Sequence, residues 1–370
     1  MNVAFVNENT LGHTSYLPRF AEYLSVHPEW NCRPIRVDAT PLPKELQSAE
    51  RGVRGLSRFG LDWQISRWRQ AASANAGALL RIASTRQRID AIVVNTQSVG
   101  LEIPRILPKV PCWVALDATF EQLARSPWFA PTRLARWFHP LTLRWLRGQE
   151  RALYRHAKGF LPWSTATAGS LREEYQVSER LIHVLPPSLE DPKPVPYAER
   201  SGSRKRILFI GGDFRRKGGY QLLNVWRESF RNQVDLHIVT RSSLAPEPGL
   251  SVHVGVEAGS DQWKSLWNTA DLFVFPSHLE TFGIVLVEAM AFGVPIISAN
   301  AGAAQDFLRE GGAGILLPSL DPGALREAIQ RMISDEDLRT RCSNRGRARF
   351  LEDFSLSTNA LRLAMLIQQP

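Results

Sequence analysis

The sequence has 370 residues, which is enough for two domains that each bury a core. Its composition, 44% hydrophobic and 22% charged, is typical of a folded protein and excludes an intrinsically disordered chain. A formal charge of +9 allows nucleic acid, an anionic membrane surface or an anionic small molecule as a partner, and charge alone does not choose among them.

The sequence pattern also argues against a membrane-spanning or secreted chain and against cysteine-based sites. No run of eighteen apolar residues occurs, and residues 1–8 lack the basic start and long apolar core of a signal peptide. We therefore expect a cytoplasmic protein. The three cysteines are scattered singly, which excludes a disulfide framework and a zinc or redox motif: Cys32, Cys112 and Cys342.

The first half of the chain alternates short apolar runs with helical patterns. Strands are predicted at 3–6, 91–95, 112–117 and 159–164, and helices at 20–24, 150–156 and 167–175. Each apolar run ends in a polar residue, as a parallel strand does when its carboxyl end faces a ligand site.

A proline-dense stretch at 185–196 can continue neither a helix nor a central strand, so we place a domain linker there. The alternation then restarts. Strands are predicted at 206–210, 235–239, 251–254, 272–275, 295–298 and 314–317, and helices at 220–230, 263–267, from 283, and at 322–333.

This alternation of strands and helices predicts an α/β protein with two Rossmann-like, doubly wound domains that face a central cleft. The predicted boundaries are an N-terminal acceptor-binding domain (1–187), a linker (188–198), a C-terminal donor-binding domain (199–350), and a C-terminal helix (351–370) that packs back on the N-terminal domain.

The most specific motif is the run from 275 to 291, in which a strand ends, a loop carries Glu280, and a helix begins near Gly283. The helix start directs free N–H groups and the positive end of its dipole to the mouth of the sheet, where a diphosphate fits. Glu280 can reach a sugar hydroxyl, and Glu288, about one turn along, can accept hydrogen bonds from a ribose. The alternative is two ordinary surface acids, but their joint occurrence with Thr281-Phe282-Gly283 favours a site.

A second motif follows the first strand of the second half. Gly211 and Gly212 allow a tight turn, and Arg216 and Lys217 supply the positive charge that a diphosphate leaving group needs. The alternative is a basic surface turn, which is common. Its position at the carboxyl end of a strand in the same domain as the two acids favours a binding role.

Together these runs resemble the donor-site motifs of glycosyltransferase family 4, retaining enzymes with the GT-B fold whose hallmark is two glutamates separated by seven residues. The resemblance extends over nearly the whole chain. It implies that a lysine and an arginine bind the diphosphate, that the backbone of 282–284 contacts phosphate and sugar, and that Glu280 and Glu288 hold the sugar and the ribose. The donor-binding residues implied are Gly211, Gly212, Arg215, Arg216, Lys217, Ser277, Glu280, Thr281, Phe282, Gly283, Ile284 and Glu288.

The chain departs from the family in three places. Many relatives carry an arginine where this chain has Gly212, so the cationic partner of Lys217 is Arg215 or Arg216. The strand ending at Val239 lacks the usual Gly-x-Gly, which leaves the base pocket open. The N-terminal loop has a single glycine, Gly12.

The activity implied is retaining transfer of a hexosyl-type sugar from a UDP or GDP sugar to an acceptor hydroxyl, in glycan biosynthesis, without a metal or other cofactor. The catalytic residues implied are Glu280, Lys217, Arg216 and Asp117. Asp117 would orient the acceptor, or else it caps the following segment. Gly12 and His13 would contact donor phosphate or acceptor, although a single loop histidine is more often structural.

Segments 51–70 and 119–151 combine arginine with tryptophan at helical spacing, as interfacial helices do on anionic lipid. They suggest a lipid-linked or cell-envelope glycan acceptor and a peripheral position at the inner face of the membrane. The alternative, that the aromatic rings pack on the N-terminal domain, stays open. Nucleic acid is not expected, because no binding module occurs.

Two other functions remain as alternatives. A related sugar-nucleotide epimerase would need its acids and histidines in a different arrangement. A non-catalytic membrane-docking subunit with a vestigial fold would not need Lys217, Glu280 and Glu288, all of which are present.

Overall fold

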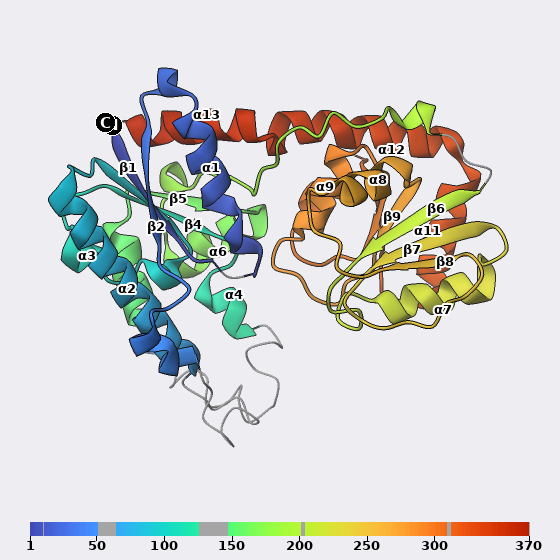
Figure 1. Ribbon diagram of the computed structural model, residues 1–370, viewed down its shortest axis with the longest axis horizontal. Coiled ribbons are helices and arrows are strands. Elements are labelled where there is room, and N and C mark those ends of the chain that lie inside the picture. The colour runs from blue at the N-terminus through green and yellow to red at the C-terminus, as the bar shows by residue number, and fades with distance from the viewer. Residues whose placement is uncertain (10, 51–63, 126–146, 201–203, 309–311, 370) are drawn as a thin grey trace. The chain divides into compact units, whose positions relative to one another are not determined.

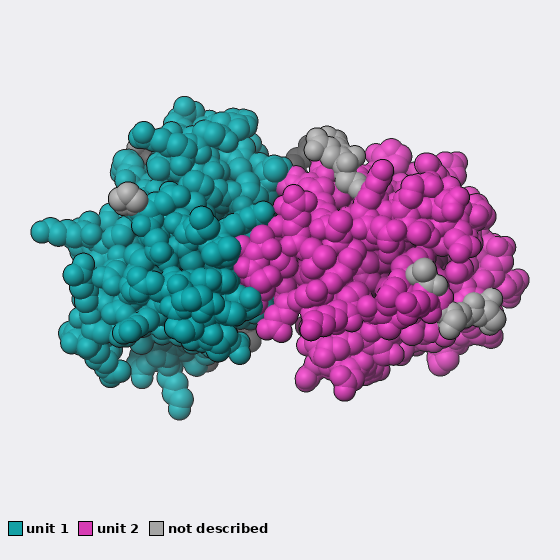
Figure 2. Space-filling view, turned by 90° about the horizontal axis from the view of Figure 1, so that it is seen from above, with its two compact units in different colours: residues 1–187, 359–370 teal, residues 188–358 magenta. Residues whose placement is uncertain are grey.

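The computed structural model describes the chain except for residues 10, 51–63, 126–146, 201–203, 309–311 and 370. It divides into two compact units, coloured separately in Figure 2. Unit 1 comprises Met1–Pro187 together with Asn359–Pro370, and unit 2 comprises Ser188–Thr358. Each unit contains a parallel sheet with helices on both faces (Figure 1), so the predicted pair of Rossmann-like α/β domains is confirmed.

The sheet of unit 1 has the strand order β2-β1-β3-β4-β5, and all its pairings are parallel. Its strands are β1 (Asn2–Asn7), β2 (Arg33–Asp38), β3 (Ala91–Asn95), β4 (Cys112–Leu116) and β5 (Gly159–Pro162). Its helices are α1 (Tyr16–Ser25), α2 (Gln64–Arg86), α3 (Ile103–Ile106), α4 (Phe120–Arg125), residues 147–156, and α6 (Thr165–Tyr175). The direction of strand order changes between β1 and β3, which makes this the switch point of the sheet.

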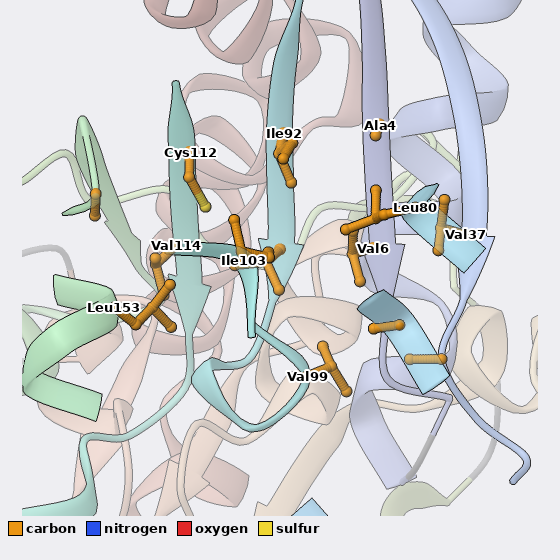
Figure 3. Close-up of a cluster of buried hydrophobic side chains, with 14 of the residues drawn as sticks. Ala4, Val6, Val37, Leu80, Ile92, Val99, Ile103, Cys112, Val114 and Leu153 are labelled. Atoms are coloured by element: carbon orange, nitrogen blue, oxygen red, sulfur yellow. The ribbon is translucent and has the colours of Figure 1, made fainter. Parts of the chain in front are cut away.

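The core of unit 1 follows from the alternation of side chains along its strands. Val6, Ile92 and Val114 point to one face, where Leu80 of α2 and Leu153 pack against them (Figure 3). Helix α1 lies on the opposite side of the sheet from α2 (Figure 1). The strands are therefore buried on both faces, as the continuous apolar runs predict.

The sheet of unit 2 has the order β11-β10-β9-β6-β7-β8, also parallel throughout. Its strands are β6 (Lys205–Ile210), β7 (Val234–Val239), β8 (Leu250–His253), β9 (Leu272–Phe275), β10 (Ile296–Ser298) and β11 (Gly314–Leu316). Its helices are α7 (Gly219–Ser229), α8 (Asp261–Thr269), α9 (Ile284–Ala291), α10 (Ala304–Leu308), α11 (Pro322–Ser334) and α12 (Glu336–Arg349). This is the classical Rossmann order, and its switch point lies between β6 and β9.

Helices cover both faces of the second sheet. Trp226 of α7 and Ile329 of α11 belong to the core on one face. On the other face Trp267 of α8 lies 5.0 Å from the ring of Phe273 on β9 and 5.9 Å from that of Phe292. Large aromatic side chains fill the space between helices and sheet and fix the strand ends on which the loops depend.

The proline-dense segment 188–196 has no helix or regular strand, and it is fastened to unit 2. The backbone N–H of Val195 donates to Asn268, and Arg200 donates to the carbonyls of Ala270 and Phe292. Downstream of α12 the chain forms a π-helical turn (Phe350–Phe354) and α13 (Leu356–Gln368), and the boundary between the units falls inside α13.

Helix α13 is bound to unit 1 by its C-terminal part. Ala360, Leu363 and Ile367 are buried, and Lys158 donates to the carbonyl of Gln369. Within the described residues, no helix is both long and apolar enough to cross a membrane.

Candidate functional site

The two motifs singled out in the second half of the sequence meet at the switch point of unit 2. Strand β6 leads through the loop 211–218 to α7, and β9 leads through the loop 276–283 to α9. Because β6 and β9 are neighbours, both loops leave the same edge of the sheet and their chains then diverge in opposite directions. Parallel α/β sheets bind their ligands at such an edge.

Two glycines with positive φ allow the loops to approach each other. Gly218 has a φ of 76°, and a methyl group built on it would lie 2.0 Å from the carbonyl oxygen of Pro276. Gly283 has a φ of 93° and directly precedes α9. A side chain at 218 would therefore force the two loops apart.

The close approach pairs Lys217 with Glu280, whose Nζ and Oε1 atoms form an ion pair. Ser277 is buried, and its hydroxyl donates to the same carboxylate at 2.9 Å. Burial lowers the pKa of the Lys217 ammonium, and the charge of Glu280 works against that change. A cation and a carboxylate thus stand side by side at the edge, each in a fixed position.

The structure separates the two arginines that the sequence left as alternatives. Arg216 donates from Nη1 to the carbonyl of Leu279 at 3.0 Å, and its Nε lies 3.3 Å from Asp213. Arg215 is exposed, with its guanidinium 5.7 Å from the ring centre of Tyr220. Arg216 therefore lies beside the Lys217–Glu280 pair, whereas Arg215, in the same loop, directs its guanidinium toward Tyr220 of α7.

The most accessible face of helix α9 carries Ile284, Val285 and Glu288. These three residues are half-buried, whereas the other residues of the helix are buried. Glu288 lies four residues after Ile284, one turn along the same face. The first residues of the helix are supported by the turn after β10. There Ala303 donates to the carbonyl of Phe282, and a methyl group on Gly302 would lie 2.8 Å from Cβ of Glu280.

Of the remaining predicted donor residues, Thr281 is half-buried and lies between Glu280 and the buried Phe282, and Gly211 and Gly212 begin the loop after β6. All the predicted donor-binding residues therefore lie on the β6 and β9 loops or the first turns of α9. Cations and a helix N-terminus at one edge suit an anionic ligand, and the half-buried Glu288 suits a hydroxyl.

A second polar cluster lies at the switch point of unit 1. His13 directs Nδ1 to Asn95 Oδ1 at 3.2 Å and Nε2 to Asp117 Oδ2 at 3.5 Å, and its ring lies 4.6 Å from that of Trp163. His13, Asp117 and Trp163 follow β1, β4 and β5, and Asn95 is the last residue of β3. Gly12 lies in the same 3-10 turn as His13 (Leu11–Thr14).

Both ring nitrogens of His13 face acceptors. Asn95 uses its amide N–H groups toward the carbonyl of His13 and toward Asn7, which leaves its oxygen for Nδ1. Burial by itself lowers the pKa of His13, but Asp117, Glu8 and Asn95 outweigh it and raise the pKa to about 9. The imidazole is therefore protonated at neutral pH and acts as a donor on both sides.

The alternative role for Asp117, a helix cap, is taken by another residue. Helix α4 begins at Phe120, and Thr119 and Gln122 form a reciprocal capping box with N–H to oxygen distances of 2.9 and 3.3 Å. The carboxylate of Asp117 instead faces His13.

Sequence reasoning missed four members of this cluster. Glu8 accepts from the hydroxyl of Thr96 and is buried, and the guanidinium of Arg69 is buried 4.0 Å above the ring of Phe120. Glu150, also buried, accepts from Tyr154 at 3.0 Å. Glu8 and Thr96 each lie close behind a buried strand, which is the signal that identified Asp117.

Most of the two basic aromatic segments lies outside the described residues. Among those described, Trp68 packs against the core of unit 1 and Arg69 is buried. Arg125 pairs with Glu174, and Arg147 pairs with Glu121 at 2.9 Å. These four side chains serve the fold of unit 1.

Comparison with known proteins finds similarity to glycosyltransferases. Residues 198–349 match the family described as glycosyl transferases group 1. The chain is 28% identical over 251 residues to the MMP alpha-(1->4)-mannosyltransferase of Mycolicibacterium hassiacum, an alignment that covers 64% of this chain and 60% of the relative. It is 40% identical over 91 residues to the capsular polysaccharide biosynthesis glycosyltransferase CapM of Staphylococcus aureus, with 25% of this chain and 24% of the relative covered.

The fold is also that of a protein of known structure. The structure superposes on sucrose-phosphate synthase from Thermosynechococcus elongatus with a TM-score of 0.71, 18% identity, and coverage of 100% of this chain and 98% of the other. The predicted GT-B architecture is thereby confirmed as a fold. The chain spans less than two thirds of the length of the two curated relatives described above.

Proposed function

We propose that the chain is a GT4-like glycosyltransferase, because residues 198–349 match the glycosyl transferases group 1 family, and that it transfers a sugar from a nucleoside-diphosphate sugar to an acceptor hydroxyl. The donor would bind at the switch point of unit 2. The acceptor would bind at the polar cluster of unit 1.

One observation carries the donor assignment: Lys217 and Glu280 are adjacent at the edge where α9 begins, and Glu288 lies one turn along the same helix. Lys217, Arg216 and the N–H groups of α9 would bind the diphosphate. Glu280 would hold a sugar hydroxyl and Glu288 the ribose. In this assignment, the residues for the sugar, the diphosphate and the ribose follow one another in the order in which the donor bonds these parts.

The mechanism proposed is retaining transfer in which the departing diphosphate receives the acceptor proton. Lys217 and Arg216 would stabilise the charge that develops on the leaving group. His13 is protonated at neutral pH, since its pKa is about 9, so it would not serve as the base. Its two N–H groups face Asn95 and Asp117, and it would act on the acceptor through its positive charge. Asp117 would hold the imidazolium in place.

We propose that no metal ion is needed, because Lys217, Arg216 and the start of α9 supply the positive charge at the diphosphate. Transfer should then continue in EDTA at an unchanged rate. Loss of transfer in EDTA with recovery on addition of Mg²⁺ would contradict this part of the proposal.

For the substrates, we propose a hexosyl donor and a cell-envelope glycan or lipid-linked acceptor. The names of the relatives, a mannosyltransferase and a capsular polysaccharide enzyme, support this choice. The arginine and tryptophan content of segments 51–70 and 119–151 supports a peripheral membrane position. Flotation with anionic liposomes tests it, and the Trp137→Ala/Arg136→Ala variant should float less.

Calorimetry against UDP, GDP and ADP tests the donor site. At least one should bind, and Lys217→Ala or Glu288→Ala should weaken that binding about tenfold to a hundredfold, because each removes a hydrogen bond to or from a charged group. Lys264→Ala, an exposed lysine on α8, is the matched control and should bind as the wild type does. If none of the three nucleotides binds, the donor assignment is wrong.

A further inference from the structure

Another arginine reaches the donor edge of unit 2 from a different strand. β7 runs beside β6 in register from Lys205↔Val234 to Ile210↔Val239, and Arg241 follows two residues after β7 ends. The N–H of Gly211 donates to the carbonyl of Val239 at 2.9 Å. This bond joins the end of β7 to the start of the glycine turn after β6.

The guanidinium of Arg241 lies directly against Gly212. A methyl group built on Gly212 would be 3.0 Å from Nε and 3.1 Å from Nη2 of Arg241. The arginine therefore occupies the space that a side chain at 212 would take. A glycine at this position leaves room for a cation that comes from the neighbouring strand.

The backbone that carries Arg241 is fixed although its side chain is exposed. Thr240 is buried, its N–H donates to the carbonyl of His253 at 3.2 Å, and its hydroxyl accepts from the N–H of Ser242 at 3.2 Å. The root of the side chain is thus held on both sides. Only the side chain itself would need to be ordered by a ligand.

Charge distinguishes Arg241 from its neighbours. Lys217 is paired with Glu280, and Arg216 with Asp213. Across the ranges described in both units, Arg241 makes no ion pair and no side-chain hydrogen bond. At this edge it has a full positive charge to offer, whereas Lys217 and Arg216 already face carboxylates and the Arg215 guanidinium lies near the ring of Tyr220.

We propose that Arg241 is a phosphate-binding residue of the donor site and that its guanidinium binds the diphosphate next to Gly212. This inference rests on the proposed function of that site. The guanidinium would donate to a non-bridging phosphate oxygen, and the absence of a side chain at 212 would let the diphosphate lie close to the backbone.

The test is binding of the preferred nucleoside diphosphate, and of the nucleoside without phosphates, to the full chain. Arg241→Ala should weaken nucleoside diphosphate binding about tenfold to a hundredfold and leave nucleoside binding unchanged. Arg231→Ala removes an exposed arginine that precedes the same strand at the opposite edge, and it should bind like the wild type.

A relocated charge makes the test independent of folding defects. Gly212 has no positive φ, so Gly212→Arg is tolerated by the backbone, and in the Arg241→Ala background it should restore most of the lost affinity. Equal binding by the wild type and Arg241→Ala would overturn the inference, as would an equal loss for nucleoside and nucleoside diphosphate. Failure of the wild type to bind any nucleoside diphosphate would instead count against the proposed function.

Discussion

At the scale of single residues, the pairing of Lys217 with Glu280 ties two proposed roles to one contact. Both side chains are largely buried, with 16% and 9% of their surfaces exposed, so neither charge is strongly screened by water. The carboxylate therefore competes with a diphosphate for the same ammonium. Removing the Glu280 carboxylate and removing the Lys217 ammonium should therefore change the affinity for a nucleoside diphosphate in opposite directions.

We predict that Glu280→Gln binds the nucleoside diphosphate about threefold to tenfold more tightly, because Lys217 loses its competing partner. The same variant should lose most sugar transfer, since Glu280 is proposed to hold the sugar. Titration calorimetry and a transfer assay on one preparation check both effects. Weaker binding of the nucleoside diphosphate by Glu280→Gln would contradict the assignment of Lys217 to phosphate.

The residues that meet at the edge of unit 2 could be brought together from the sequence because each belongs to a short local motif. Lys217 and Glu280 each follow a recognisable strand, and the parallel topology implies that such loops share an edge. The cluster around His13 was only partly predictable. Glu8 and Thr96 are separated by 88 positions, and Arg69 lies on a helix whose register with the sheet the sequence does not reveal.

At the scale of elements, Gly218 decides how β6 joins α7. Its positive φ costs an L-residue roughly 1 kcal/mol, and the overlap with the carbonyl of Pro276 adds to that cost. Gly255 offers a matched comparison. It has a similar φ of 74° but no atom within 4 Å of an added methyl group.

We predict that Gly218→Ala lowers the free energy of unfolding by about 2 kcal/mol more than Gly255→Ala does. It should also weaken nucleoside diphosphate binding, because the loop that carries Lys217 must shift. Chemical denaturation gives the first quantity and calorimetry the second. Equal destabilisation by the two substitutions would show that the loop gives way without cost.

Strand β2 and helix α12 are among the elements that escaped prediction, each for its own reason. Strand β2 has the sequence Arg33-Pro34-Ile35-Arg36-Val37-Asp38, and its polar residues and proline are typical of the sheet edge on which it lies. Helix α12 is rich in arginine and has few apolar residues, so its pattern lacks an apolar stripe. Its burial depends on side chains such as Arg339, which donates to the carbonyls of Met332 and Ile333 at 2.6 Å.

At the scale of the whole molecule, the two units contain separate cores and separate charged sites. His13 belongs to unit 1, and its folded-state pKa of about 9 lies above the ordinary value of 6.5. Protonated His13 therefore stabilises unit 1 fully below pH 6.5, and that stabilisation is lost as the pH rises toward 9. The nucleotide, in contrast, is expected to stabilise unit 2.

We predict two resolvable transitions in scanning calorimetry. Raising the pH from 6.5 to 9 should lower the stability of one of them by on the order of 3 kcal/mol, and His13→Gln should flatten this dependence. The nucleoside diphosphate should raise the temperature of the other transition only. A single transition that responds to both treatments would show that the units unfold together.

The division of unit 1 between residues 1–187 and 359–370 bears on how the protein is made. A ribosome releases 188–358 as one uninterrupted stretch, so unit 2 can close its sheet as soon as that stretch has emerged. Unit 1 begins earlier and finishes later, because α13 must pack on it through its own side chains Leu363 and Ile367. Until α13 has packed, unit 1 lacks part of its buried apolar contacts, and such incompletely packed chains are prone to aggregation.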